Sequence, residues 1–461
     1  MTQVKHEDET TWSWPAATGG SPHPKPTAGA APTAHASPPG VDGLWRMDGY
    51  GTVLALGHGV YQEYQTTSIS CLKGDTARQT GPGTYTSDGD VLTVRLGRDR
   101  DHATVHADSS VGHRRLRRIA QLPRVCARPT PDDPRTTFDV FWQSFEENYP
   151  FFAAKGVDWR AVRERYRPLV HASTTRDELF DIFRRMVRPL YDAHVLVQDG
   201  DRLFAEGWPG TDIPSAELND RIKEYVVDRD LKGAADRQDF ANGRITYAAL
   251  PDGGPGYLRI ATFSGYTTGD ETYTADLAEL DRALNAVLTH RPHGLIIDLR
   301  INGGGSDALG IHIAERLTDT PYTAYSKRAR NDPADATRHT RPEPIPVVPA
   351  AGPRYTGPVA VLTGGSTVSA GETFTQALVD RPGRPVRIGQ PTQGVFSDVM
   401  VRRLPNGMAV WLPNEEYLTR TGRTFDGVGI PPHLTEPVFT KEEFAQHRDS
   451  AFDRAVALLR R

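Results

Sequence analysis

Ser369 lies in the segment VLTGGSTVSAGETF, where a short apolar strand runs into glycines and a helix is predicted to begin. Two interpretations fit this pattern. Ser-x-x-Glu at a helix start is a capping box, in which Ser369 accepts the amide of Glu372 and Glu372 reaches back to the amide of Ser369. A helix start also offers free backbone amides and a positive dipole end, which can hold a developing oxyanion. Ser369 is therefore either a cap or a nucleophile, and the second role requires a base nearby.

Three glycines, Gly303, Gly304 and Gly305, follow the apolar run GLIIDLR and precede another predicted helix. Because they lack side chains, the backbone can approach a ligand closely, so an amide at Gly304 or Gly305 is a candidate oxyanion donor. The alternative is a plain turn between a strand and a helix. No Gly-Lys-Ser/Thr follows the glycines, which argues against a phosphate-binding loop.

His194 ends the segment LYDAH at the close of a predicted helical region. Histidine is the usual base that activates a serine nucleophile. The chain has 15 histidines, and a single histidine is more often a surface or core residue than a catalytic one. His194 becomes a candidate base only in combination with Ser369 and a group that orients its ring.

The elements that would position these residues fall into five segments. Residues 1–40 are rich in Pro and Ala and are expected to be disordered, because such a sequence buries too little apolar surface. Residues 41–128 alternate apolar and polar positions between Gly-Asp turns, which predicts a small antiparallel β domain. Helical spacing of aromatic residues predicts a helical subdomain over 135–200. Residues 201–440 alternate strands and helices as an α/β core, and a C-terminal helix is expected over 441–461.

Two shorter segments carry further predictions. Asn406-Gly407 within VRRLPNGMAVWLP predicts a hairpin turn. The proline-rich stretch 319–356 is expected to be an excursion near the site or a loop that contacts a partner. The aromatic stripe of the helical subdomain is expected to be core rather than a ligand pocket.

Composition excludes several classes of protein. Lys and Arg number 54 against 58 Asp and Glu, a formal charge of −4, so nucleic acid is not an expected partner. No run of about 18 apolar residues is present, so no transmembrane segment is expected. The N-terminus lacks the pattern of a Sec signal peptide, which makes the cytoplasm the default expectation, with a secreted precursor as the alternative. Cys71 and Cys126 could pair or remain as two thiols. Neither belongs to a CxxC motif, and neither a metal nor a cofactor is expected.

Four ordered motifs resemble one known family. They are YDAH, GLIIDLRINGGG, STVSAGETF and the closing run GQPTQG…LPNGMAVWLP…FDGVGIPPH, and the aromatic helical segment also fits. Together they resemble the serine peptidases that include the tail-specific (C-terminal processing) proteases, the tricorn protease core and the interphotoreceptor retinoid-binding protein repeats. The resemblance covers about residues 135–438. It implies a mixed α/β core of the crotonase/ClpP-like fold.

The resemblance also implies roles for individual residues. Ser369 matches the nucleophile, and the amides of Ala370 and of Gly304 or Gly305 match the oxyanion hole. Tail-specific members have a lysine base where this chain has Val395, whereas the tricorn-like branch uses a histidine at the position of His194. The resulting triad is Ser369, His194 and Asp426.

At two positions of the candidate site the chain differs from the residue that is usual in the family. Asp426 stands where glutamate is usual and is one methylene shorter, and Ala193 stands where tricorn has a serine. Asp192 could support the histidine or cap a turn. Glu372 could be the capping partner of Ser369 or a helper at the oxyanion or the substrate amine.

Three hypotheses follow for function. The first is a serine endopeptidase or oligopeptide hydrolase that acts on peptides or unfolded proteins. The second is a non-catalytic protein that binds apolar ligands on the same fold, and the third, weaker one is a crotonase-like acyl-CoA enzyme. The PDZ domain of tail-specific members is not expected between His194 and Gly256, so substrate C-termini would need another receptor. The β domain could serve as a lid, a docking surface or the contact of a homo-oligomer.

Overall fold

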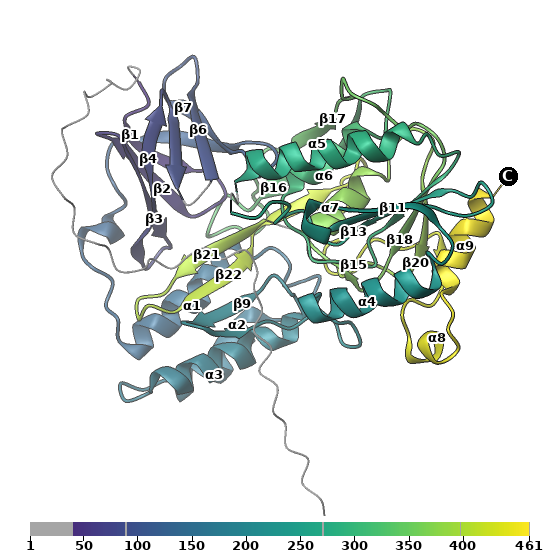
Figure 1. The fold of residues 1–461 in the computed structure, drawn as a ribbon. Helices are drawn as coiled ribbons and strands as arrows, with labels where there is room; N and C mark the ends of the chain where they lie inside the picture. The colour runs from purple at the N-terminus through teal and green to yellow at the C-terminus, as the bar shows by residue number, and fades with distance from the viewer. Residues whose placement is uncertain (1–39, 88–89, 270–271, 397, 461) are drawn as a thin grey trace, which may run out of the picture.

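The computed structural model describes residues 40–87, 90–269, 272–396 and 398–460 (Figure 1). Residues 1–39 of the segment expected to be disordered lie outside this range. In the described part of the chain, a small β barrel, a helical region and a larger α/β core pack against one another. No helix of the described residues is long and apolar enough to cross a membrane.

The segment predicted to be a small antiparallel β domain forms a closed barrel in which β1 pairs with both β2 and β8. Alternate side chains point inward because successive residues of a strand face opposite sides, and Trp45, Leu54, Tyr85 and Leu116 are buried in this core. The strands are β1 Gly43–Met47, β2 Thr52–Gly57, β3 Val60–Thr66, β4 Cys71–Gly81, β5 Thr84–Ser87, β6 Asp90–Leu96, β7 His102–Ala107 and β8 Arg114–Ile119.

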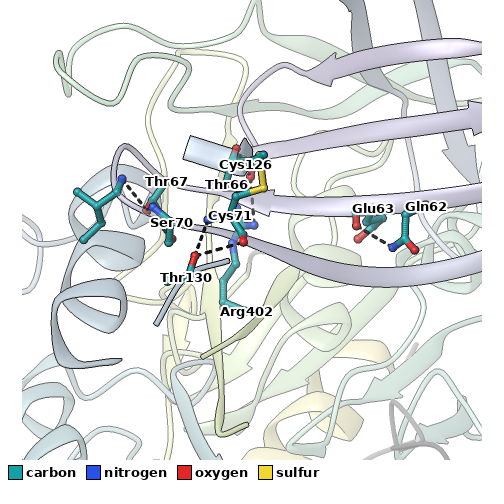
Figure 2. The surroundings of a disulfide bond; sticks show 11 residues. Gln62, Glu63, Thr66, Thr67, Ser70, Cys71, Cys126, Thr130 and Arg402 are labelled. Atoms are coloured by element: carbon teal, nitrogen blue, oxygen red, sulfur yellow. Dashed lines mark hydrogen bonds between the residues drawn. A yellow bond between two sulfur atoms is a disulfide. The ribbon is translucent and has the colours of Figure 1, made fainter. Parts of the chain in front are cut away.

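A disulfide between Cys71 and Cys126 settles the alternatives that the sequence leaves open (Figure 2). Cys71 begins β4, and Cys126 lies in the short 3-10 helix η1 Arg124–Ala127 that follows the barrel. The hydroxyl of Thr130 accepts the amide of Cys71 at 3.1 Å and donates to its carbonyl at 3.3 Å. The chain leaving the barrel is therefore tied to the barrel before it enters the helical region.

The aromatic stripe predicted to be core is buried between helices α1 Pro134–Asn148, α2 Trp159–Tyr166 and α3 Arg176–Val187. The rings of Phe141 and Phe183 stack with centroids 3.9 Å apart. This region also packs on a four-stranded sheet of order β10-β9-β22-β21. The predicted hairpin at Asn406-Gly407 is confirmed as part of this sheet, whose strands are β9 Leu196–Asp199, β10 Arg202–Phe204, β21 Val399–Arg403 and β22 Ala409–Pro413.

The α/β core is a seven-stranded sheet of order β11-β12-β13-β14-β18-β20-β24, parallel from β13 onward. Its strands read as continuous apolar runs because helices cover both faces. One face, with Ile296 and Leu362, packs on α4 and α9, and the other, with Ile297 and Val361, packs on α5, α6 and α7. The strands are β11 Ala235–Phe240, β12 Ile245–Ala249, β13 Gly256–Ile260, β14 Leu295–Asp298, β18 Val359–Thr363, β20 Val386–Gly389 and β24 Leu434–Thr435. The helices are α4 Ala216–Arg229, α5 Tyr273–Thr289, α6 Asp307–Glu315, α7 Ala370–Ala377 and α9 Ser450–Leu459.

Two segments differ in detail from their sequence predictions. The C-terminal segment forms two helices, α8 Lys441–Ala445 and α9, because Asp449 caps α9 and also pairs with the buried Arg300 at 2.6 Å. The stretch 319–356 is not only a loop, since it contains β16 Tyr322–Ala329 and β17 Glu343–Val347, which form a sheet with β23 Glu415–Leu418. Its prolines are compatible with strands here because β17 lies at the edge of that sheet.

Candidate active site

Ser369 occupies a strained turn between the short strand β19 Ser366–Thr367 and helix α7. Its backbone angles, φ 55° and ψ −124°, lie in a region that non-glycine residues rarely adopt. Its side chain makes no capping hydrogen bond to the helix and is half-exposed. The capping box is therefore wrong as a description of this serine, whose side chain is left without a role in the helix start.

Glu372 is not the capping partner of Ser369, and its alternative role as a helper at the oxyanion or the substrate amine stays a prediction. Its buried carboxylate accepts the amides of Gly394 at 2.6 Å and Val395 at 2.7 Å. The carbonyl of Val395 in turn accepts the amide of Ser369 at 3.1 Å. Burial raises the pKa of Glu372 to about 7. Glu372 thus holds the segment against which the strained serine backbone rests.

Gly304 faces the serine directly. A β-carbon placed on Gly304 would lie 2.5 Å from the Ser369 β-carbon and 2.9 Å from its hydroxyl oxygen, and 3.3 Å from the amide nitrogen of Ala370. Gly304 also has a φ of +83°, which favours glycine. The glycine run after β14 is therefore more than a plain turn, because it brings backbone within contact of the candidate nucleophile.

The two candidate glycine amides differ in their partners. The amide of Gly304 donates to the side-chain oxygen of Asn302 at 3.0 Å, so it is already engaged. Within the described residues, the amides of Gly305 and Ala370 donate to no acceptor. Gly305 is held in place by a parallel bridge to Phe263, where the amide of Ser306 donates to the carbonyl of Phe263. Of the three candidate amides, those of Ala370 and Gly305 are thus the ones without an acceptor among the described residues.

His194 follows the 3-10 helix η3 Arg188–Leu190, where Tyr191 takes a left-handed conformation with φ 46° and turns the chain. The amide of His194 donates to Asp192 at 3.0 Å, and the hydroxyl of Tyr149 donates to the other carboxylate oxygen of Asp192 at 2.7 Å. Asp192 therefore fixes the backbone of this turn.

The histidine turn lies beside the serine turn. Ala193 packs in one small buried cluster with Val368 and Val395. Ala193 directly precedes His194, and Val368 directly precedes Ser369. The carbonyl of Val395 accepts the amide of Ser369. The structure thus brings the two turns together, and Val395, at the position of the lysine base in tail-specific proteases, is buried in the contact.

Asp426 is buried next to the same turns. Its carboxylate accepts the amide of Phe396 at 3.3 Å and the hydroxyl of Thr424. Burial, together with the nearby carboxyl groups of Glu372 and Asp192, raises the pKa of Asp426 to about 8. Asp426 and Glu372 thus lie near Asp192 of the histidine turn, and their raised pKa values are typical of functional sites.

Three residues to which the sequence assigned no role border this site: Lys155, Trp208 and Tyr191, the first residue of the YDAH motif. The rings of Tyr191 and Trp208 stack with centroids 5.9 Å apart, and the Lys155 amine lies 5.1 Å from the centre of the Trp208 ring. The only sequence feature that could have pointed to Lys155 is its position just after the aromatic residues of NYPFFAAKG. Among the described residues, this site included, no group of three or more His, Cys, Asp or Glu side chains could hold a metal ion.

Comparison with known proteins gives this site a context. Residues 254–435 match the profile described as peptidase family S41, and residues 130–188 match that of the tricorn protease C1 domain. The chain is 28% identical over 197 residues to the chloroplastic C-terminal processing peptidase of Tetradesmus obliquus, covering 41% of this chain and 38% of that protein. It is 26% identical over 221 residues to a carboxyl-terminal-processing protease of Picosynechococcus, covering 47% of this chain and 46% of the relative. The chain thus matches less than half the length of these two curated relatives.

A solved structure extends the similarity to the fold. A peptidase candidate from Parabacteroides merdae superposes with a TM-score of 0.60 and 27% identity, over 71% of this chain and 96% of that chain. The family resemblance inferred from the four motifs is confirmed by these matches. The similarity to peptidase family S41 thus covers residues 254–435, and the similarity to the tricorn protease C1 domain covers residues 130–188.

Proposed function

We propose that this chain is a serine peptidase that hydrolyses peptide bonds through an acyl-enzyme on Ser369. The strained conformation of Ser369 carries the proposal, because this half-exposed serine makes no cap bond and directly precedes Ala370, whose amide, like that of Gly305, has no acceptor among the described residues. A helix cap needs no such strain, and neither does a site that only binds apolar ligands. The proposed substrates are peptides or unfolded proteins, and the proposed core fold is crotonase/ClpP-like.

In the proposed reaction His194 accepts the proton of the Ser369 hydroxyl as its oxygen attacks the substrate carbonyl carbon. The negative charge that develops on the carbonyl oxygen is stabilised by the amides of Ala370 and Gly305, at the positive end of α7. The imidazolium then donates its proton to the leaving amine, and the C–N bond breaks. Water repeats the sequence on the acyl-enzyme and releases the second product.

Asp426 is proposed to orient His194 and to stabilise the imidazolium, as the acid of a triad does. This role requires its carboxylate form, whereas burial raises its pKa to about 8. The proposed triad therefore gains activity as the pH approaches that value. Asp192 and Glu372 are proposed as positioning residues, since the first holds the histidine turn and the second holds the segment that accepts the Ser369 amide.

The experiment is labelling with a fluorophosphonate, followed by peptide mapping and by hydrolysis of a peptide pool. We expect one adduct on Ser369, which is absent in Ser369→Ala and slowed by about three orders of magnitude in His194→Ala. Ser173→Ala, an exposed loop serine, is the matched control and should behave like the parent protein. Peptide hydrolysis that persists unchanged in Ser369→Ala would refute the proposal, and so would a folded protein that forms no adduct.

A further inference from the structure

Lys155 places a positive charge at the border of the candidate active site. It lies in the turn between α1 and α2, and its amine donates to the carbonyl of Tyr191 at 3.4 Å. A β-carbon on Gly427, next to Asp426, would lie 3.8 Å from the ε-carbon of Lys155. Burial raises the pKa of Glu372, and the charge of Lys155 acts on it in the opposite direction. Lys155 is therefore close to residues of both the histidine turn and the closing run.

Among the residues that the structure describes, no Asp or Glu oxygen lies within 4.0 Å of the amine of this half-buried lysine, whose hydrogen bond goes to a backbone carbonyl. Lys327 shows what the fold does elsewhere with a buried lysine, since its amine is 2.9 Å from Glu415 and 3.3 Å from Asp398. A lysine amine has three donors, and Lys155 directs one to a carbonyl and lies over a tryptophan ring. It can therefore still donate to an anionic group of a ligand.

The aromatic pair beneath Lys155 is tied to the serine turn. The backbone amide of Trp208 donates to the side-chain oxygen of Gln393 at 2.9 Å. The backbone amide of Gln393 donates to the carbonyl of Thr367 at 3.0 Å, and Thr367 lies two residues before Ser369. Tyr191 precedes His194 by three residues and is fixed by its left-handed turn. We call Lys155, Tyr191 and Trp208 the Lys155 platform. Hydrogen bonds and chain position thus link this platform to both the serine turn and the histidine turn.

We propose that the Lys155 platform binds a carboxylate of the peptide substrate and so determines specificity. This inference rests on the proposed peptidase function. The described residues between β10 and β13 add α4, β11 and β12 to the core rather than a separate domain, and the proposal therefore assigns carboxylate recognition to the site itself. The carboxylate is either the C-terminal α-carboxylate or a side chain of Asp or Glu, and two pairs of substrates distinguish these sources.

The test compares kcat/KM on hexapeptide pools that differ only in charge. One pair consists of a pool with free C-terminal acids and the same pool as C-terminal amides. The other pair consists of amidated pools in which one internal position is Glu or its neutral isostere Gln. The variants are Lys155→Met, which keeps the length of the side chain, and Lys155→Arg, which keeps the charge. Lys232→Met, at an exposed lysine between α4 and β11, is the matched control.

We expect Lys155→Met to lose about tenfold in kcat/KM on the pool that carries the recognised carboxylate and little on its neutral partner, mainly through KM. Lys155→Arg should retain most of the preference, Lys232→Met should retain all of it, and added salt should weaken it in the parent protein. Equal loss on charged and neutral pools would overturn the inference, because it would indicate a merely structural role. Parent protein that cleaves both members of each pair equally well would also overturn it.

A binding measurement separates failure of this inference from failure of the peptidase proposal. The Ser369→Ala variant keeps the platform but has no nucleophile, so its thermal midpoint is recorded with each pool, with and without Lys155→Met. A larger upward shift with the carboxylate pool that disappears in the double variant supports the platform even if the parent protein hydrolyses nothing. Equal shifts with charged and neutral pools refute the platform even if Ser369 is shown to be the nucleophile.

Discussion

Replacing Gly304 by alanine should disable the candidate nucleophile while costing little more stability than the same change elsewhere. Gly304 and Gly407 share a φ of +83°, but the two sites differ in their surroundings. A β-carbon on Gly407 would meet nothing within 4 Å, whereas on Gly304 it would lie 2.5 Å from the β-carbon of Ser369. Gly407→Ala is therefore a control for the backbone strain alone.

The magnitudes follow from these distances. An alanine with positive φ costs about 1 to 2 kcal/mol in either position. Carbon atoms pack at about 3.5 to 4.0 Å, so at Gly304 the serine must also retreat by about 1 Å or more. A displacement of about 1 Å at reacting atoms can lower the rate about a hundredfold. We therefore expect Gly304→Ala to lose about two orders of magnitude in labelling rate and in kcat/KM, and about 1 to 3 kcal/mol in the free energy of unfolding.

The assay pairs the rate of fluorophosphonate labelling with denaturant unfolding of the same samples. Gly407→Ala should show a similar loss of stability from strain and a labelling rate like that of the parent protein. Labelling of folded Gly304→Ala at the parental rate would refute the geometry of the site. An equal loss of labelling in Gly407→Ala would show that the effect comes from general loosening of the fold.

Two further predictions concern pH and the disulfide. Burial raises the folded-state pKa values of Glu372 and Asp426 to about 7 and about 8, so the native state binds more protons than the unfolded state and stability should fall as pH rises from about 4 to about 8. Denaturant unfolding across this pH range should show the fall in stability, and Glu372→Gln should make that fall smaller by about 3 kcal/mol. In the same range kcat/KM should rise with the ionisation of Asp426. A flat stability profile would contradict the burial of these groups. Replacing Cys71 and Cys126 by serine opens a loop with a sequence separation of 55 and should cost about 4 kcal/mol of stability, measured by denaturant unfolding beside a non-reducing peptide map. A non-reducing map with both thiols free would contradict the pairing and favour the cytoplasmic expectation, since disulfides persist in oxidising compartments.

The order of elements was predictable because local patterns determine it. Alternation in the barrel strands and helical spacing in the aromatic segment depend on residues close in sequence. The continuous apolar strands likewise indicated a sheet covered on both faces. The C-terminal segment departs from its prediction because a distant group decides it, namely Arg300, which pairs with the cap of α9 and interrupts the expected single helix.

The candidate site shows the same division. The sequence placed a serine at a strand-to-helix turn and glycines after a buried strand, and the structure puts Gly304 against Ser369. It could not show that Glu372, at a good capping distance in sequence, instead accepts amides more than twenty residues away. The Glu372 carboxylate accepts two charge-assisted hydrogen bonds from loop amides, whereas a capping box would give it one. Lys155 was missed for the related reason that its position beside Trp208 depends entirely on tertiary packing.

The barrel, whose role the sequence leaves open, contacts the core next to the oxyanion loop. The hydroxyl of Ser306, adjacent to Gly305, donates to the carbonyl of Ser109 in the loop before β8 at 2.6 Å. The hydroxyl of Ser110 donates to Asp398 at 2.9 Å, and Asp398 in turn pairs with the buried Lys327.

The contacts between barrel and core involve the partners of the buried Lys327. Lys327 also pairs with Glu415, which accepts the hydroxyl of Tyr50 from the barrel. Removing one member of such a buried set leaves the others without compensation, which is far more costly than losing a surface ion pair. The barrel therefore cannot shift away from the core without exposing these charges and releasing the loop that carries the Gly305 amide, so its attachment is part of what keeps the proposed oxyanion donors in place.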